Sequence, residues 1–404
     1  MATKLVLTGA RIARNLGGPS LLSSTLEVLT KALGEIDVIY YSPARDDVAI
    51  GSTYGVQVRR LPGRLQCVFW ALVWFATRLR LGPSDVRQFL AAIRESEAVI
   101  DILGIRFSDK LGNQSLPGRL IKGTVYVTAR LLGRPMIKYT CDMGPFALRW
   151  NRCVSRFYLN SCVDLILARS VTTKQRLEEL GVSTPIRVSP DTAFLLSPTS
   201  SSFSQSLEGA VRPLIGFSVS HMAAKQFGDR STYAQFMAQI ADATARITEG
   251  RLLFIPNEYS DNAADDDLSV AHEVLEAMRA PDRATLFEGA DWPGSDVKGV
   301  IAQCDAVISS RYHTIIASLS LGIPVFAIGW HAKYDGVLRL FGLEELVCSL
   351  EAPNVDSLVE RVSIFWSDRD RIRATILDRL PNVREEIMAA AICVADWLRE
   401  DRHR

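Results

Sequence analysis

The stretch DAVISSRYHTIIASLSLGIPVFAIGWHAK, residues Asp305–Lys333, predicts a strand, a polar turn, a helix and a second strand. Asp305–Ser309 is apolar and contains β-branched residues, which is typical of a buried parallel strand. Gly322 suits the left-handed position that ends a helix, and Pro324 suits the start of the next strand. The two strand ends therefore predict one edge of an open parallel sheet, where α/β proteins bind their ligands.

Three side chains that can carry positive charge follow these predicted strands, namely Arg311, His313 and Lys333. The predicted helix Thr314–Leu321 begins beside them, and the amide groups and dipole of a helix N-terminus favour an anion. Many α/β folds carry an Arg and a His in such a turn for packing alone. The pattern by itself therefore leaves two interpretations open, an anion site and a packing role.

The run SSRYHTIIASLSLGIPVFAIGWHAK, ending at Lys333, resembles the signature of the polysaccharide pyruvyl transferase family. That signature is a strand ending in Ser, then Arg-x-His, an apolar helix, Gly-x-Pro, a strand, and a Lys near its end. The resemblance implies a transferase that moves a pyruvyl group from phosphoenolpyruvate to a sugar diol of a polysaccharide or glycolipid, forming a pyruvate ketal. It also implies that the His of Arg-x-His, here His313, is central to catalysis.

The chemistry of this transfer requires cations and an acid. Arg311 can bind a phosphate or a carboxylate through two parallel hydrogen bonds, and Lys333 adds a point charge. His313 titrates near neutrality, so it can act as the general acid. The sequence contains no metal-ligand pattern and this reaction requires none, so we expect phosphoenolpyruvate as donor substrate and no cofactor.

The composition is that of an ordinary globular protein with no global charge bias. The chain has 404 residues and a formal net charge of +1, which gives no indication of nucleic-acid binding. Its seven cysteines are scattered and form no C-x-x-C, which favours reduced thiols in the cytoplasm. The N-terminal residues are typical of a first strand and not of a signal peptide.

The most apolar run is CVFWALVWFAT, residues Cys67–Thr77. It is shorter than the ~20 residues that a membrane-spanning helix needs. Arginines flank it on both sides: Arg59, Arg60, Arg64, Arg78 and Arg80. One interpretation is a buried helix. The other is an interfacial helix, with residues 65–80 in peripheral contact with the inner face of the membrane.

Two α/β halves are predicted on either side of a Ser- and Pro-rich segment. Lys4–Thr8, a Gly-bearing loop and the helix Ser20–Leu33 open a Rossmann-like unit, although the loop lacks G-x-G-x-x-G. The pattern restarts at Leu214. With the family resemblance, we expect an α/β, glycosyltransferase-B-like fold of two Rossmann-like domains with a C-terminal helix packing back on the first. The expected boundaries are 1–196 (acceptor side), a linker 197–213, 214–380 (donor side) and a C-terminal helix 381–404.

Four further residues are candidates for the site. The resemblance places Asn15 in an Asn-x-Gly loop that lines the cleft, and Arg169 at a strand–helix step, where it contacts the donor, bridges domains or forms a structural salt bridge. Asp142 ends a strand and either accepts a proton from an acceptor hydroxyl or hydrogen-bonds its own tight loop. His221 follows the strand Leu214–Val219 and is a candidate cleft residue.

Two alternative functions remain open. A glycosyltransferase would bind a nucleotide diphosphate sugar at the same helix N-terminus. A non-catalytic sugar-binding member is also open, because Asp101–Asp109 replaces a glycine-rich segment that many family members carry. The acidic run Asp265–Asp267 is interpreted as a solvated helix start, since it lacks the alternation of a calcium loop.

Overall fold

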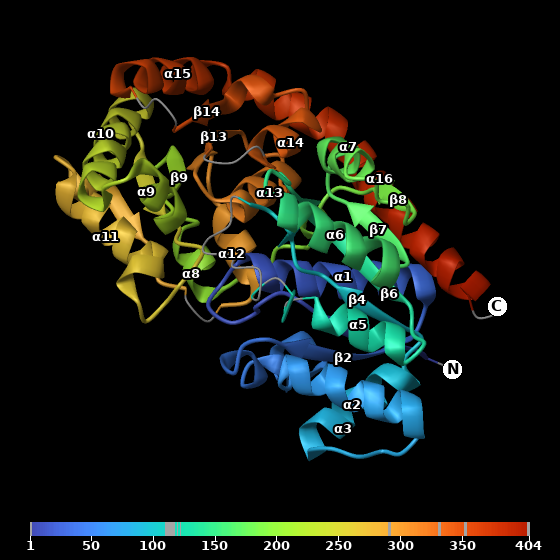
Figure 1. Ribbon diagram of the computed structural model, residues 1–404. Coiled ribbons are helices and arrows are strands. Elements are labelled where there is room, and N and C mark those ends of the chain that lie inside the picture. The colour runs from blue at the N-terminus through green and yellow to red at the C-terminus, as the bar shows by residue number, and fades with distance from the viewer. Residues whose placement is uncertain are drawn as a thin grey trace. The chain divides into compact units, whose positions relative to one another are not determined.

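A computed structural model of the protein describes residues 2–109, 118, 120–121, 123–289, 292–329, 333–350 and 354–401. They form two compact α/β units, whose elements are labelled in Figure 1. The first unit comprises Met1–Ile12, Leu21–Thr192 and Glu385–Arg404, and the second comprises Ala13–Ser20 and Ala193–Arg384.

The first unit is built on a parallel sheet with strand order β3-β2-β1-β4-β6-β7-β8, and β5 pairs with β6. Its strands are β1 (Thr3–Thr8), β2 (Ile36–Ser42), β3 (Gln57–Arg60), β4 (Ala98–Asp101), β5 (Ile105–Arg106), β6 (Met136–Met143), β7 (Leu165–Ala168) and β8 (Ile186–Val188). Its central strands β1, β4, β6 and β7 are mostly apolar and buried because helices cover both faces. The order reverses between β1 and β4, as in a Rossmann fold.

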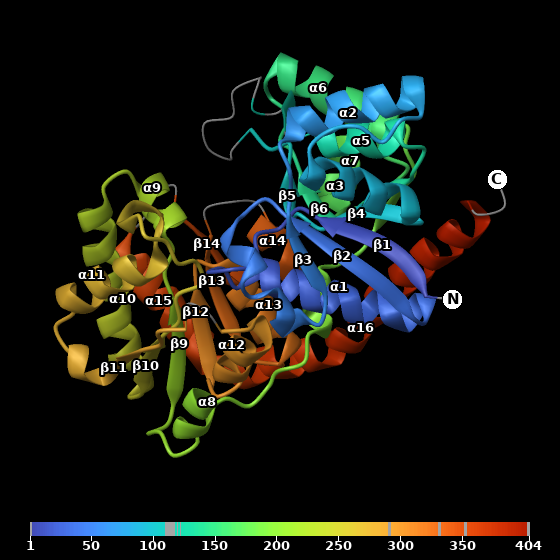
Figure 2. The ribbon, with the colours of Figure 1, turned by 90° about the horizontal axis from the view of Figure 1, so that it is seen from below.

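The helices of this unit lie on opposite faces of the sheet, as Figure 2 shows. One face is covered by α2 (Arg64–Thr77), α3 (Ser84–Glu95), α5 (Thr124–Leu131), α6 (Arg149–Cys162) and α7 (Val171–Glu179). The other is covered by α1 (Gly17–Leu33) and the end of α16 (Arg369–Asp401). Short 3-10 helices at Asp46–Val48 and Gly51–Tyr54 follow β2.

The C-terminal helix α16 returns to the first unit, as the sequence predicts. Pro381 lies inside this helix, where it removes one backbone donor shortly before the return at Glu385. Ala390, Val394 and Leu398 then recur on one helical face and pack into the core below the sheet. The C-terminal residues therefore stabilise the N-terminal sheet.

Helix α2 is buried on one side only. Cys67 and Ala71 lie in the core and Trp70 and Trp74 pack against it, while the other large apolar residues are exposed, so the buried-helix interpretation holds for one side of the helix. The reason is that the helix is apolar on all sides, and a pattern without a polar face does not indicate which side packs. Across the part of the chain that the structure describes, no helix is both long and apolar enough to cross a membrane.

The second unit is a parallel sheet with strand order β11-β10-β9-β12-β13-β14. This order again reverses at its centre, between β9 and β12. The strands are β9 (Leu214–Ser218), β10 (Arg251–Phe254), β11 (Ala284–Leu286), β12 (Ala306–Ser309), β13 (Val325–Gly329) and β14 (Val347–Ser349).

The helices of the second unit alternate with these strands. They are α8 (Ser202–Ser206), α9 (His221–Phe227), α10 (Arg230–Thr248), α11 (Asp267–Ala277), α12 (Gly294–Ile301), α13 (Tyr312–Ser320), α14 (Lys333–Arg339), α15 (Val355–Ser367) and the start of α16. Short 3-10 helices occur at Thr192–Leu195, Ala263–Asp265, Pro281–Arg283 and Glu344–Leu346. The stretch Asp305–Lys333 thus folds into the strand, helix and strand expected of it, with the helix beginning two residues earlier, at Tyr312 rather than Thr314.

The chain enters the second unit slightly before the predicted linker. Phe194 is buried and its ring centroid lies 5.8 Å from that of Phe341, within the second unit. Buried Lys298 donates to the carbonyl oxygens of Ala193 and Leu196. Composition changes only at Ser197, after this packed segment, and therefore does not mark where the unit begins.

The core role of α16 gives a stability prediction. Val394→Ala removes buried methyl groups, so we expect it to lower the free energy of unfolding by about 2 kcal/mol. Ile392→Ala on the same helix is the matched control, because Ile392 is 49% exposed, and a change within about 0.5 kcal/mol is expected. Urea unfolding checks both. Equal effects of the two changes would contradict this packing of α16.

Candidate active site

The reversal of strand order in the second unit brings two candidate residues together. β9 and β12 are neighbours, with Ser218 opposite Ser309, and both strands end at the same edge. The next residues are Arg311, which precedes α13, and His221, which begins α9. His221 Nδ1 lies 2.7 Å from Arg311 Nη2. A ligand site is expected at this position in a Rossmann-like sheet.

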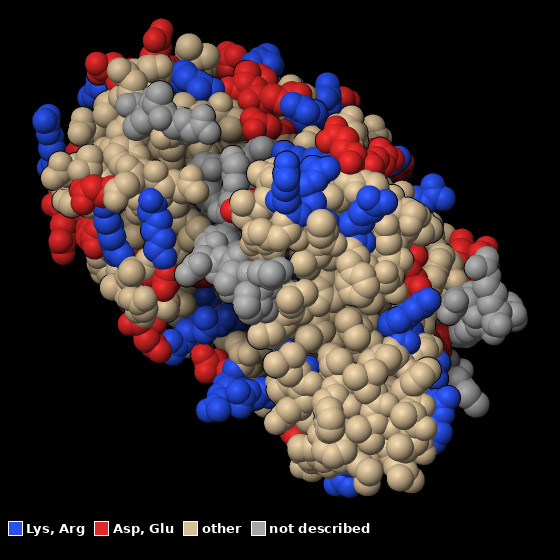
Figure 3. Space-filling model, viewed as in Figure 1, with Lys and Arg blue, Asp and Glu red and all other residues tan. Residues whose placement is uncertain are grey.

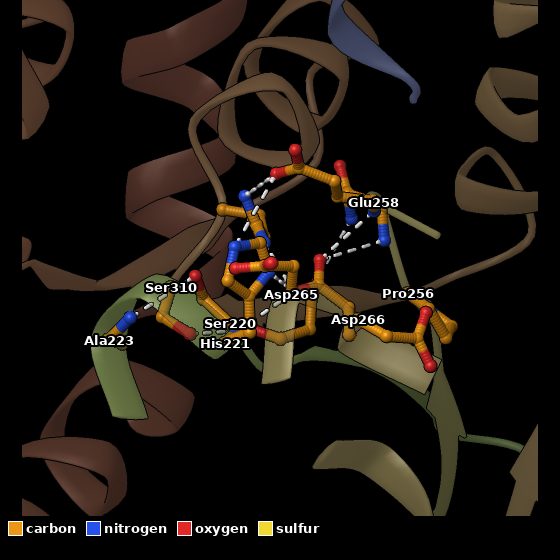
Figure 4. A network of polar contacts seen from close by, with 12 residues as sticks. Ser220, His221, Ala223, Pro256, Glu258, Asp265, Asp266 and Ser310 are labelled. Atoms are coloured by element: carbon orange, nitrogen blue, oxygen red, sulfur yellow. Dashed lines mark hydrogen bonds and ion pairs between the residues drawn. The ribbon is translucent and has the colours of Figure 1, made fainter. Parts of the chain in front are cut away.

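Two carboxylates hold the Arg311 guanidinium. Figure 4 shows part of the surrounding polar network, with His221 and Glu258 labelled. Its Nη1 donates to Glu258 Oε2 at 3.0 Å, and its Nη2 donates to Asp267 Oδ1. Asp267 is fully buried and also accepts from the backbone amides of His221 and Glu258, at 2.9 and 3.1 Å. Asn257 adds a third backbone amide at 3.2 Å. Asp267 therefore fixes the direction of Arg311.

The electrostatics of this network favour the ionised pair. Burial would lower the pKa of Arg311, but Asp267 and Glu258 raise the pKa overall. Burial would raise the pKa of Asp267, but Arg311 and His221 lower it. Both groups therefore carry charge at neutral pH, inside a site that is shielded from water.

A small cavity of about 150 Å³ lies next to this network. Its walls are Asn15, Gly17, Asn257, Arg311, Tyr312, His313, Lys333 and Tyr334, all of the second unit. The volume is below the range of about 300–1,000 Å³ that drug-sized ligands occupy. Two helices begin at it, since α1 starts at Gly17 and α13 at Tyr312. The cavity therefore suits a small anion.

The backbone of Gly17 lies close to the His313 ring and fixes its position. A Cβ added at Gly17 would lie 2.4 Å from both Cε1 and Nδ1 of His313, so position 17 tolerates only glycine next to this ring. The Gly17 amide donates to Asn15 Oδ1 at 2.7 Å, and Asn15 thereby caps α1. Asn15 in turn pairs with Glu258 in a short antiparallel bridge. This pairing places the Asn15 loop in the second unit, with Arg311.

Lys333 lies at the start of α14 and borders the same cavity. Its Nζ lies 5.1 Å from the ring centroid of Tyr312 and 5.4 Å from that of Tyr334. The hydroxyl of Tyr334 donates to the carbonyl oxygen of Ser310 at 2.8 Å. The aromatic rings therefore hold a cation beside the cavity. Residues 330–332 of the predicted signature lie outside the described residues.

Arg169 and Asp142 lie together in the first unit. Arg169 is buried, with Nη1 at 3.5 Å from Asp142 Oδ2 and Nη2 at 3.0 Å from Asp191 Oδ2. Asp142 also accepts from the Thr173 hydroxyl at 3.0 Å. A Cβ added at Gly104 would lie 2.6 Å from Arg169 Nη2. These contacts favour the salt-bridge interpretation of Arg169.

Ion pairs stabilise the segment Asp101–Asp109, which departs from the family pattern. Asp101 is fully buried, and its carboxylate lies 2.8 Å from Arg106 Nη2 and 3.1 Å from Lys138 Nζ. Burial would raise the pKa of Asp101, but the two cations and the Tyr126 hydroxyl lower it. Asp101 thus has a structural role, holding Arg106 and Lys138 in the first unit.

Asp267 and Glu258 were not predicted as site residues, whereas Gly17 is the glycine of the predicted Asn-x-Gly loop. Interpreting Asp265–Asp267 as a solvated helix start is wrong for its last two residues: the Asp265 side chain is half-exposed and pairs with Lys225, whereas Asp266 and Asp267 are buried. Asp266 caps α11 by accepting from the Ser269 amide at 2.8 Å. The D-x-x-S spacing of Asp266 and Ser269 signals that cap, but no local pattern signals a partner of Arg311.

A model of the polysaccharide pyruvyl transferase family matches residues 119–332. The amylovoran biosynthesis protein AmsJ of Erwinia amylovora is 23% identical over 309 residues, which cover 73% of this chain and 71% of AmsJ.

Two solved structures are similar to the whole chain. Spinosyn forosaminyltransferase SpnP has a TM-score of 0.56 at 11% identity, with 100% of both chains covered. Sucrose-phosphate synthase from Thermosynechococcus elongatus has a TM-score of 0.59 at 13% identity, with 98% of both chains covered. At these identities the likeness shows the fold alone. It confirms the predicted glycosyltransferase-B-like fold of two Rossmann-like domains.

The buried Asp267 gives a pH-dependent prediction. Asp267→Asn leaves Arg311 without its buried charge partner, so we expect a loss of about 3–5 kcal/mol at pH 7 and a lower Tm. Because the folded pKa is depressed, the native pair stabilises above the unfolded pKa of about 3.9, and this is lost as pH falls below it. The Tm difference between wild type and variant should therefore shrink in acid.

Asp261→Asn is the matched control for this prediction. Asp261 forms an exposed ion pair with Arg14 in the same unit, and such pairs contribute little. Calorimetry across pH 3 to 7 measures all three proteins. A Tm difference for Asp267→Asn that stays constant with pH would contradict an ionised native Asp267.

Proposed function

The chain belongs to the polysaccharide pyruvyl transferase family, and we propose that it transfers a pyruvyl group from phosphoenolpyruvate to a sugar diol, forming a pyruvate ketal. The observation that carries the proposal is the gathering of Arg311, His313 and Lys333 around one small cavity at two helix N-termini. Phosphoenolpyruvate is a small dianion or trianion at neutral pH, and this cavity combines small size with positive charge.

The donor is held by charge in this proposal. Arg311 offers a planar fork to the phosphate or carboxylate, and Lys333 adds a second cation in the wall of the same cavity. Asp267 keeps the fork in place from its buried side. Glu258, whose side chain is 37% exposed, is the partner that an incoming anion displaces from Nη1. No cofactor is required.

His313 supplies the proton. Transfer begins when the methylene carbon of phosphoenolpyruvate gains a proton and one sugar hydroxyl attacks its central carbon. A second hydroxyl then replaces phosphate at that carbon, which closes the ketal ring. His313 lies in the first turn of α13, lines the same cavity as Arg311 and lies against Gly17, so we place its ring beside the bound donor.

The acceptor in this proposal is a polysaccharide or glycolipid. The family acts on polysaccharides, and the relative AmsJ is by its name a protein of amylovoran biosynthesis. Asn15 lines the cavity of the proposed donor, His221 is buried against Arg311 and Asp267, and Asp142 and Arg169 form an ion pair in the first unit. We place the reaction in the cytoplasm, with residues 65–80 in peripheral contact with the inner face of the membrane.

The proposed acid role of His313 gives a prediction about turnover. His313→Ala should lower kcat about 100- to 10,000-fold, because a positioned proton donor is lost, while Tm changes little. Mass spectrometry of a galactoside, glucoside or mannoside incubated with phosphoenolpyruvate measures turnover as a gain of one pyruvate less one water. His272→Ala, an exposed histidine of the same unit, is the control and should keep full turnover. Undiminished turnover of His313→Ala would exclude it as the acid.

The proposed donor binding by Arg311 gives a prediction about affinity. Arg311→Lys keeps a cation near Asp267 but loses the planar fork, so phosphoenolpyruvate affinity should fall about tenfold or more. The rise in Tm with added phosphoenolpyruvate measures this affinity. Arg339→Lys changes an exposed arginine of the same unit and should leave the affinity unchanged.

The same titration separates the proposal from its alternative. A glycosyltransferase would be stabilised by a nucleotide diphosphate sugar instead of phosphoenolpyruvate. Stabilisation by nucleotide sugars alone, at equal concentrations, would therefore overturn the proposed donor.

A further inference from the structure

Helix α2 has an outward face made of large apolar side chains. Leu65, Phe69, Leu72 and Phe75 are 64%, 56%, 49% and 54% exposed and follow one another at helical spacing. An ordinary surface helix buries such residues, but α2 exposes these four and packs Cys67, Ala71, Trp70 and Trp74 against the core. Figure 3 shows the surface over α2 and α3 as a broad tan area at lower right. An apolar patch of this kind marks an interaction surface.

The charge around this face is predominantly positive. Residues 59–94 contain seven arginines and one acidic residue, Asp85, although the whole chain has a formal net charge of only +1. The arginines are Arg59, Arg60, Arg64, Arg78, Arg80, Arg87 and Arg94. From Leu65 to Thr77 the sequence contains no charged residue. An uncharged face is therefore bordered by cations.

Aromatic rings and arginines also line a hollow beside this face. A cavity of about 330 Å³ opens between α2 and α3, with Trp70 and Trp74 in its wall and Arg80, Arg87 and Arg94 among its other lining residues. The Arg94 guanidinium lies 4.5 Å from the Trp74 ring centroid. Tryptophan next to arginine is typical of the boundary between hydrocarbon and lipid headgroups.

We propose that α2 and α3 form a docking surface for an anionic phospholipid membrane. Helix α2 lies in the plane of the interface, with Leu65, Phe69, Leu72 and Phe75 among the acyl chains, and the arginines bind headgroup phosphates. The cytoplasmic leaflet carries negative charge that attracts such arginines. This inference specifies the membrane contact proposed above. It rests on the proposed function only in one respect: the purpose of the contact is to bring the enzyme to a lipid-linked acceptor.

The charge pattern favours a membrane over a second copy of the chain. A twofold dimer through this face would place the patch against itself, so arginines would face arginines in both copies. A lipid surface provides both an apolar interior for the phenylalanines and phosphates for the arginines. One partner thus satisfies both features of the surface.

Co-sedimentation of the full chain with vesicles tests the proposal. We expect binding to vesicles that contain phosphatidylglycerol, weak binding to pure phosphatidylcholine, and weaker binding at high salt. Replacing both phenylalanines, Phe69→Ser with Phe75→Ser, should lower partitioning about tenfold or more. Replacing Arg78 and Arg80 by Gln should lower it about fivefold or more.

The control is Phe157→Ser, because Phe157 of α6 is 57% exposed in the same unit but lies outside this surface. It should bind vesicles as wild type does. Equal losses in Phe157→Ser and in the double variant would overturn the proposal, as would an absence of wild-type binding. A wild-type dimer in sedimentation velocity that the double variant converts to monomer would instead assign the face to a second copy. Vesicle binding is measured without donor or acceptor, so its result does not depend on whether the protein forms a ketal.

Discussion

The buried ion pair of Arg311 and Asp267 is the interaction on which the site depends. It lies where the strand order of the second sheet reverses, and Asp267 takes three backbone amides in addition to the guanidinium. A charge buried at this depth is stable only when it is paired and hydrogen-bonded. Its local consequence is that β9, β10, β12 and the start of α11 are held in one arrangement, with the Arg311 fork at the edge of the cavity.

The remaining site residues depend on that arrangement. Glu258, next to the pair, also carries the short bridge to Asn15, and that bridge draws the start of α1 into the second unit. Gly17 then approaches His313 closely, which fixes the ring against the backbone. The contacts that position His313, the proposed acid, therefore belong to the same network that positions Arg311, the proposed cation for donor binding. In this account both roles use one rigid site.

Much of this was predictable from local sequence. The apolar strand Asp305–Ser309 and the Arg-x-His that follows predict a cationic strand end, and the structure brings Arg311, His313 and Lys333 to one cavity. Asp267 and Glu258 were not predictable, because they lie more than forty residues from Arg311 and no spacing rule connects them. Asn15 follows a strand of the first sheet, yet its backbone pairs with the second unit. Such long-range pairing has no local signal. The outward face of α2 was also undecided, since an all-apolar run gives no preferred side.

The central claim is that phosphoenolpyruvate gives its three-carbon unit to a sugar as a ketal. Nuclear magnetic resonance of the saccharide product, made with phosphoenolpyruvate isotope-labelled at its central carbon, tests it most directly. The account predicts that the label appears in a quaternary carbon bonded to two oxygens of one sugar residue, with release of one phosphate. Label that remains in phosphoenolpyruvate or free pyruvate, with every candidate sugar diol unmodified, would contradict it.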